Sequence, residues 1–365
     1  MNNEMVFGRW EGTCLLITMI ATKAVLGFPR VMMESAGVAG WILSAYISFL
    51  ALIGFWIINK LYKGFPGKDI LDIGESLGGK PVKIITGTVI WVYLTFMMIT
   101  SLRLFGELIK SMGFPTTPPS FLMLFFFVGV FFAAYIGIES IVRFMAILVP
   151  VSVVSFLIFI FALAPLGDIN NIFPLLGNGA YEIFVKGSSK VSCFSEVLFL
   201  FLIAPFMKTH ENFKKSGLIS IFISGVVFLS ITLIFISMYP NPVAREVLLP
   251  AYQLGRTIDY GRFFKRLESI LIITWSTIGF MHLSTVFFFS AHVFKKTFNL
   301  KYYRPLLFPL GVICFSISII PERLMDVISF EAKYDRNWSW TISFGLTIIL
   351  LIFANIKRKK PVKRH

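Results

Sequence analysis

The sequence predicts an all-α polytopic membrane protein with ten transmembrane helices, and three observations lead to this prediction. The 365 residues are 56% hydrophobic and 15% charged, whereas soluble domains are about 45–50% apolar and about 25% charged. The mean hydropathy is +0.80. Ten long apolar runs follow one another along the chain. Together these features exclude a soluble fold, a disordered chain, a collagen and a secreted disulfide scaffold.

Each apolar run is long enough to cross the hydrocarbon core, which takes about 20 residues in a helix. The runs do not alternate polar with apolar residues, and lipid cannot satisfy backbone groups, so we expect helices and not strands. The first run is not a cleaved signal peptide, because Lys23 lies in its middle and nine more runs follow. The expected spans are 11–29, 37–59, 84–106, 119–138, 142–164, 186–207, 216–239, 268–294, 304–321 and 338–356.

The distribution of Lys and Arg predicts the orientation, since cytoplasmic segments of membrane proteins are richer in these residues. With the amino terminus inside, the inner segments hold twenty Lys and Arg and the outer segments hold eleven. Both termini are therefore expected in the cytoplasm. The net charge of +15 indicates contact with anionic membrane lipid and not with nucleic acid. The basic tail at 357–365 is interpreted as a topology anchor.

Five spans in each half predict a single membrane domain, 1–365, built from an inverted repeat of 11–164 and 186–356. Transporters of this design interrupt the first helix of each half near the middle of the membrane, where freed backbone groups bind the ligand. Span 1 contains the small and polar stretch Ala21-Thr22-Lys23-Ala24, followed by Gly27 and Pro29. Span 6 contains a similar stretch, Gly187 to Glu196, followed by Pro205. Broken helices 1 and 6 are therefore expected, although small residues of this kind also pack helices together.

The candidate ligand site lies between spans 1, 3, 6 and 8, where a small polar nutrient would meet freed N–H groups near Ala24 and Ser195. Tyr93 and Met97 share one face of span 3, because residues four apart are neighbours on a helix. The alternative for most of these side chains is ordinary packing. The expected ligand-binding residues are Thr22, Lys23, Ala24, Gly27, Tyr93, Met97, Ser192, Ser195, Glu196, Thr277 and His282.

Lys23 and Glu196 are the charges deepest in the spans, and each lies in the predicted break of its own half. Isolated charges are costly in a membrane, and pairing lowers that cost. We therefore expect the two side chains to interact, directly or through the ligand. Two further pairs follow i,i+4 spacing: Arg103–Glu107 is interpreted as a solvated helix end, and Glu139–Arg143 as a boundary anchor.

No catalytic set, metal-ligand spacing or phosphate-binding loop is visible, so neither an enzyme nor a cofactor is expected. Cys14, Cys193 and Cys314 all fall inside apolar runs and match no zinc or redox motif. We interpret them as small core residues.

Four stretches resemble the B-subunit permease family of spore germinant receptors, within the amino acid–polyamine–organocation transporter superfamily. They are Leu26-Gly27-Phe28-Pro29, the loop from Asp168 through Pro174 to Gly179 with Gly187, the run from Glu196 to Pro205, and Pro250-Ala-Tyr-Gln-Leu254 with Ile258, Phe264 to Glu268 and Trp275. The likeness runs nearly end to end. Two departures concern the ligand: Lys23 stands where glycine is usual, and His282 where lysine is frequent.

The resemblance implies a LeuT-like amino acid permease fold and a subunit that senses a small nutrient, commonly an amino acid, a nucleoside or a sugar. It also implies partners, an A subunit and a lipoprotein C subunit, in the spore inner membrane. The alternative is a proton-coupled amino acid permease that transports its ligand, with the proton carried by Glu196. A sensor can retain a transporter's fold, so the sequence does not separate these two functions.

Overall fold

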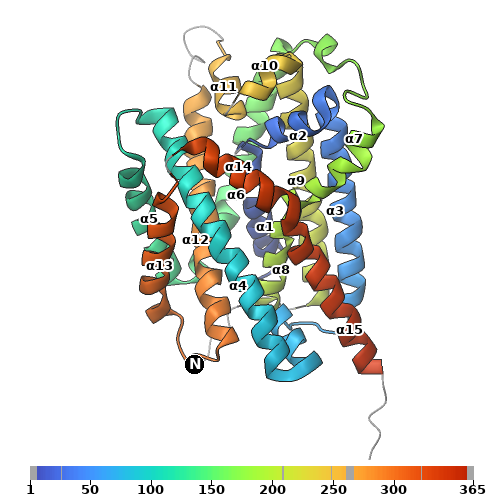
Figure 1. The fold of residues 1–365 in the computed structure, drawn as a ribbon, viewed down its shortest axis with the longest axis vertical. Helices are drawn as coiled ribbons and strands as arrows, with labels where there is room; N and C mark the ends of the chain where they lie inside the picture. Colours follow the sequence, from blue (N-terminus) through green and yellow to red (C-terminus); the bar gives the residue numbers. More distant parts are fainter. Residues whose placement is uncertain are drawn as a thin grey trace, which may run out of the picture.

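The computed structural model describes residues 6–25, 27–207, 209–247, 249–259, 267–321 and 323–359, and Figure 1 shows that they form a bundle of helices. Within these ranges, eight helical segments are long and apolar enough to cross a membrane. Helices α1, with 17 residues, and α13, with 16, are shorter. The helical bundle confirms the predicted fold class, while the number of ten spans remains a prediction. The eight segments are Phe28–Tyr62, Ile70–Gly113, Pro119–Ile136, Ile138–Leu166, Ala180–Phe206, His210–Met238, Ser269–Thr297 and Leu324–Arg358.

The first half of the chain contains six α-helices, in which the expected first span is divided. Gly27 separates α1 from α2 and has a left-handed φ of 92°, which glycine adopts without a steric penalty. The long helix α4 is kinked where Gly78 and Gly79 leave helical geometry. These helices are α1 (Arg9–Val25), α2 (Phe28–Ala36), α3 (Gly40–Tyr62), α4 (Ile70–Gly113), α5 (Pro119–Ile136) and α6 (Ile138–Leu163).

The second half begins with the short helix α7 and a helical segment of unusual geometry. Segment η4 (Lys186–Val197) is a 3₁₀-helix of 12 residues, although 3₁₀ runs longer than three or four residues are uncommon and mark strain or a hinge. It continues into α8 and the short 3₁₀ turn η5. The α-helices are α7 (Ala180–Phe184), α8 (Leu198–Ile203), α9 (His210–Met238), α10 (Asn241–Glu246), α11 (Pro250–Arg256), α12 (Leu267–Thr297), α13 (Arg304–Ile319), α14 (Leu324–Trp340) and α15 (Thr347–Lys359).

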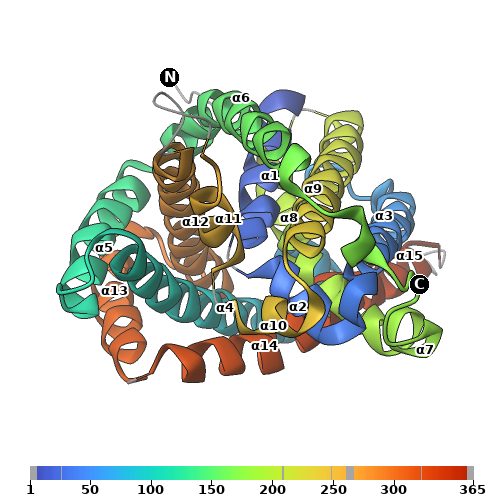
Figure 2. The ribbon, with the colours of Figure 1, turned by 90° about the horizontal axis from the view of Figure 1, so that it is seen from above.

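The two divided helices lie inside the bundle. Figure 2 shows α1 and α8 surrounded by α3, α6, α9 and α12, with α5 and α13 together on one side. Helix α1 packs against α9, α6, α12 and η4, and α4 packs against α12. Residues 12–20 and 192–204 are almost all buried. The apolar surroundings therefore enclose the few charged side chains that these helices carry.

The structure corrects the expected outer loop between the last two spans. Residues 324–340 form α14, which crosses the bundle in front of α1 (Figure 1). A π-helix, Thr341–Leu346, joins it to α15. The stretch lies almost wholly between the expected spans 304–321 and 338–356 because it is too polar for a span, but its buried face packs against η4.

Parts of the sequence motifs lie outside the described residues, namely Leu26 of the first motif and Phe264 to Arg266 of the last one. The preceding part of the last motif, Pro250–Arg256, is helix α11. The predicted tail is described only as far as residue 359.

Candidate functional site

Lys23 and Glu196 form an ion pair at the centre of the bundle. The Lys23 Nζ atom lies 2.6 Å from Glu196 Oε1, and the side chains are 7% and 0% exposed. Lys23 also donates a hydrogen bond of 3.4 Å to the Ser195 hydroxyl. The predicted interaction between these two charges is therefore confirmed, and it joins the broken helix of one half to the broken helix of the other.

Asp335 is a third charged member of this cluster, and sequence reasoning missed it. Its Oδ2 atom lies 3.5 Å from Lys23 Nζ, and its side chain is 7% exposed. The Tyr93 hydroxyl lies 3.4 Å from Asp335 Oδ1 and 3.0 Å from the Ser195 hydroxyl. Tyr93 thus contacts both the 3₁₀ segment and α14. We call Lys23, Tyr93, Ser195, Glu196 and Asp335 the central cluster.

A sequence signal for Asp335 existed. Glu331, Asp335, Ser339 and Ser343 recur at intervals of four, which places them on one helix face. All four are buried. A polar stripe at helical spacing indicates a buried polar face, whereas a solvated loop has no such periodicity.

Helix α14 is fastened to η4 just beyond Asp335. The Lys190 Nζ atom donates to Asn337 Oδ1 at 2.7 Å. Two and three residues further along, the Ser339 hydroxyl donates to the Ser192 carbonyl at 3.3 Å and the Trp340 N–H donates to the Ser192 hydroxyl at 3.2 Å. Ser192 therefore holds α14 in place through Ser339 and Trp340.

The central cluster has one more acidic group than basic groups. Glu196 and Asp335 face Lys23 alone among the described ion pairs, and the Glu196 Oε2 atom is buried without a hydrogen-bond partner among the described residues. Breaking a buried ion pair by removing one partner costs about 3–5 kcal/mol, because the other charge stays buried. The arrangement can accept a further positive charge or hydrogen-bond donor at Glu196.

The backbone at the first break differs from the expected one. Helix α1 continues to Val25, so Thr22, Lys23 and Ala24 lie in its last turn. The groups freed at the end of a helix are carbonyls, whereas freed N–H groups belong to the beginning of one. The expectation of free N–H groups near Ala24 is therefore wrong. The freed donors are those at the start of α2, beyond Gly27.

The second break is a change of helix type. Segment η4 keeps 3₁₀ geometry as far as Val197, and only Phe194 leaves it, with φ −106° and ψ 16°. The tighter winding places Ser192, Ser195 and Glu196 in a fully buried stretch. The N–H of Leu198 still bonds to a carbonyl of this segment, so the run is continuous and not unwound.

The other expected site residues have different surroundings. Met97 is buried one turn from Tyr93, and Thr22 donates to the Thr18 carbonyl. His282 is 4% exposed and hydrogen-bonds the backbone of Met19. The Thr277 hydroxyl donates to the Ile273 carbonyl of its own helix. Ala24 lines an apolar cavity on another face of α1.

Of the two further ion pairs, Arg103–Glu107 is buried and Glu139–Arg143 is exposed. Arg103 Nη2 lies 2.7 Å from Glu107 Oε1, with side chains 6% and 11% exposed, so the interpretation as a solvated helix end is wrong. Helices α5 and α12 pack against this turn of α4, where the Phe105 ring contacts Phe126 and Trp275. Arg143 and Glu139 form a pair of 2.5 Å with 74% and 43% exposed side chains, which agrees with a boundary position.

Comparison with known proteins identifies the family of this chain. The model of the family described as spore germination protein matches residues 10–327. The chain is 27% identical to spore germination protein YndE of Bacillus subtilis, over 97% of both chains. It is 21% identical to spore germination protein A2 and 24% identical to spore germination protein B2 of the same organism, over 97% and 87% of both chains respectively.

Two solved transporters share the fold at low sequence identity. Mhp1, a nucleobase-cation-symport-1 family transporter with bromovinylhydantoin bound, superposes with a TM-score of 0.71 at 10% identity, covering 99% of this chain and 95% of its own. MhsT in complex with L-phenylalanine superposes with a TM-score of 0.65 at 17% identity, covering 97% and 99%. The LeuT-like fold class that the family resemblance implies is thereby confirmed.

Proposed function

Because this chain belongs to the spore germination protein family, we propose that it is the transporter-like subunit of a germinant receptor. In this proposal it binds a small nutrient near the middle of the membrane and signals germination through partner subunits. The observation that carries the proposal is the central cluster, in which Lys23, Glu196 and Asp335 meet inside an apolar bundle. Ionisable groups buried inside a membrane protein carry a large free-energy cost, so their presence indicates a functional site.

The proposed ligand site lies beside this cluster, between α1, α4, η4 and α12. Tyr93, Met97 and Ser195 supply an aromatic ring, a flexible apolar side chain and a hydroxyl there. An amino acid is the proposed ligand class, since its ammonium suits the partner-free oxygen of Glu196. MhsT, which has a similar fold, holds L-phenylalanine, and this supports the proposal without deciding the ligand of this chain.

The proposed partners are a receptor A subunit and a lipoprotein C subunit, in the spore inner membrane. Relatives named spore germination protein A2, B2 and KB support membership of such a receptor. The apolar helices make the chain an integral membrane protein. Cytoplasmic placement of both termini is part of the proposal and rests on the distribution of Lys and Arg.

A second candidate function is a proton-coupled amino acid permease. The observation that favours it is the complete burial of Glu196 with one carboxylate oxygen unpartnered, because such a carboxyl group can exchange a proton when the site opens. Uptake of labelled amino acids into proteoliposomes under a proton gradient separates the two functions. Accumulation of ligand supports the permease, whereas saturable binding without uptake supports the receptor subunit.

The test of the receptor function uses spores that lack this chain. Germination of deletion and complemented spores is followed with a panel of amino acids, nucleosides and sugars. Complementation is expected to restore the response to one nutrient class, and a Glu196→Gln version is expected to lose that response at normal protein level. An unchanged nutrient profile in the deletion spores would contradict the proposal.

A further inference from the structure

A pocket of about 540 Å³ lies at one end of the bundle, between α10, α11, the last turn of α4 and the start of α14. Figure 1 shows α10 and α11 together at this end. With six and seven residues, these two helices are too short to cross a membrane. They lie between the expected spans 216–239 and 268–294, on the side of the membrane opposite to the two termini. The pocket therefore belongs to the expected outer face.

The wall of this outer pocket carries two opposite charges. Glu246 is the last residue of α10 and Arg256 is the last residue of α11. Both side chains are exposed, so a molecule dissolved in water can reach them. The aliphatic part of the wall consists of Val243, Val247, Leu249 and Leu324.

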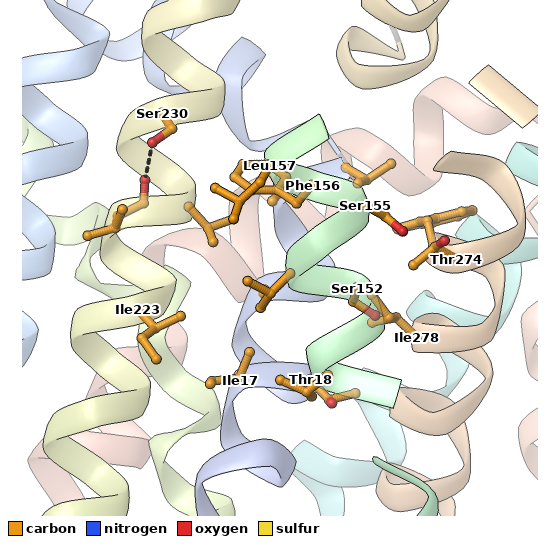
Figure 3. Close-up of a pocket in the computed structure, with 18 of the residues that line it drawn as sticks. Ile17, Thr18, Ser152, Ser155, Phe156, Leu157, Ile223, Ser230, Thr274 and Ile278 are labelled. Carbon is orange, nitrogen blue, oxygen red and sulfur yellow. Dashed lines mark hydrogen bonds between the residues drawn. The ribbon is translucent and has the colours of Figure 1, made fainter. Parts of the chain in front are cut away.

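The cavity between α1, α6, α9 and α12 has a different wall. Figure 3 shows mainly apolar side chains around it, and the Ser230 hydroxyl there donates to the Val226 carbonyl of its own helix. No charged side chain is among the described residues that line it. Of these two spaces, the outer pocket therefore has the charges that can select a ligand.

The two charges of the outer pocket do not pair with each other. No ion pair of Glu246 or Arg256 is present in the described part of the chain, whereas the exposed Glu139 pairs with Arg143 elsewhere on the surface. Arg256 lies instead over the Tyr252 ring, with its guanidinium carbon 5.8 Å from the ring centre. This cation–π contact holds the guanidinium in place and leaves its N–H groups available to a carboxylate.

We propose that the outer pocket binds a small zwitterion of the amino acid class with an aliphatic side chain. Arg256 binds its carboxylate, because a guanidinium holds a carboxylate through two parallel hydrogen bonds. Glu246 accepts hydrogen bonds from its ammonium, and the aliphatic part of the wall covers its side chain. Taking about 30 Å³ for a group of the size of water, a molecule of on the order of ten non-hydrogen atoms needs about 300 Å³. The pocket provides this space.

The outer pocket is a second site, separate from the central cluster. Leu324 in its wall is the first residue of α14, and Asp335 lies about 16 Å further along the same helix at about 1.5 Å per residue. An occupant therefore contacts the helix that completes the central cluster. The proposal follows from the charges of the outer pocket and does not rest on the proposed receptor function.

The test uses the purified full chain in a non-ionic detergent, with L-leucine as the probe. Binding is measured by saturation-transfer difference NMR. Two analogues each lack one charge of leucine: 3-methylbutan-1-amine lacks the carboxylate, and 4-methylpentanoate lacks the ammonium. Leucine is expected to bind saturably to the wild-type protein and to a Glu196→Gln variant. Each analogue is expected to bind about tenfold more weakly, the effect of one lost charge-assisted hydrogen bond.

Variants of the two charged side chains test the position of the probe. Arg256→Gln and Glu246→Gln, each combined with Glu196→Gln, are expected to weaken leucine binding about tenfold. Arg143→Gln and Glu139→Gln change the charges of an exposed pair on α6, outside the outer pocket, and are the matched controls. Both controls are expected to leave leucine binding unchanged.

Three results would overturn the proposal. Leucine binding that is insensitive to Arg256→Gln would place the probe elsewhere. Equal binding of an analogue that lacks one charge would mean that the pocket does not select a zwitterion. Leucine binding that is lost in Glu196→Gln protein, or absent in monodisperse wild-type protein, would exclude a second site. Loss of binding only on Glu196→Gln would still agree with the proposed function, so the two proposals fail separately.

Discussion

Lys23 Nζ lies 2.6 Å from Glu196 Oε1, although one residue belongs to α1 and the other to the 3₁₀ segment η4. Asp335, from α14, approaches the same ammonium to 3.5 Å. Three segments that are far apart in the sequence therefore depend on one another through a single buried lysine. Any movement that separates these segments must expose or strand a charge, and this dependence leads to the first two predictions.

Neutralising Lys23 alone is expected to destabilise the protein more than neutralising Lys23 and Glu196 together. Lys23→Met leaves the carboxylates of Glu196 and Asp335 buried without their cation and is expected to cost about 3–5 kcal/mol, whereas Glu196→Gln leaves Lys23 beside Asp335 and is expected to cost less. The double variant leaves Asp335 as the one carboxylate without a cation, so it recovers part of the loss and the two effects are non-additive. The measurement is the thermal denaturation midpoint of purified protein in detergent, combined as a double-mutant cycle. Simple additivity would mean that the two side chains do not interact.

Asp335→Asn is expected to impair the nutrient response while preserving the fold. The amide keeps the size of the side chain and can still accept from the Tyr93 hydroxyl, but the second carboxylate beside Lys23 is lost. The measurement is the germination rate of complemented spores against nutrient concentration, with protein level determined by immunoblot. Asp326→Asn, in the first turn of the same helix, is the matched control. A normal response of the Asp335 variant would exclude this residue from the site.

Removing the buried pair Arg103–Glu107 is expected to lower the free energy of unfolding more than removing the exposed pair Glu139–Arg143. Both pairs are spaced i,i+4, but their surroundings differ. Glu107→Gln is expected to cost about 3 kcal/mol, and Glu139→Gln less than about 1 kcal/mol, as for surface pairs. Denaturation midpoints of the two variants in detergent give the comparison, and similar losses would restore the interpretation of Arg103–Glu107 as a solvated helix end.

Cysteine labelling is expected to place the 175–180 loop and the basic tail on opposite sides of the membrane. The native Cys14, Cys193 and Cys314 are buried, so they give a low background. A cysteine at Leu176, which is 55% exposed, should react with an impermeant maleimide in intact cells. A cysteine at Lys357 should react only after permeabilisation. Labelling of the tail from outside would reverse the proposed orientation.

The sequence was sufficient for the fold because the membrane imposes simple rules on it. Apolar runs of span length must be helices in lipid. The small residues before Gly27 and after Gly187 indicated where one helix is divided and where another takes 3₁₀ geometry. The Lys23–Glu196 contact also followed from the sequence, since two costly charges in symmetric breaks lower their energy by pairing. These inferences need only composition, length and repeat symmetry.

Asp335 and the buried Arg103–Glu107 pair could not be placed by the same rules. A hydropathy pattern treats a polar stretch as solvated, and α14 is polar along one face although that face is buried against η4. Likewise, the spacing of Arg103 and Glu107 is the same in the core and on the surface. Their burial depends on which helices cover them.

The sequence by itself determined the class of protein, its helical membrane fold and the two charges that meet in the bundle. Only the tertiary structure decided that α1 continues through Lys23 to Val25, that Asp335 completes the central cluster, and that residues 324–340 form a helix packed against η4. The physical reason is that periodicity and charge cost are local or averaged properties, whereas burial, cavities and the third partner of an ion pair arise from the packing of helices that are distant in the chain.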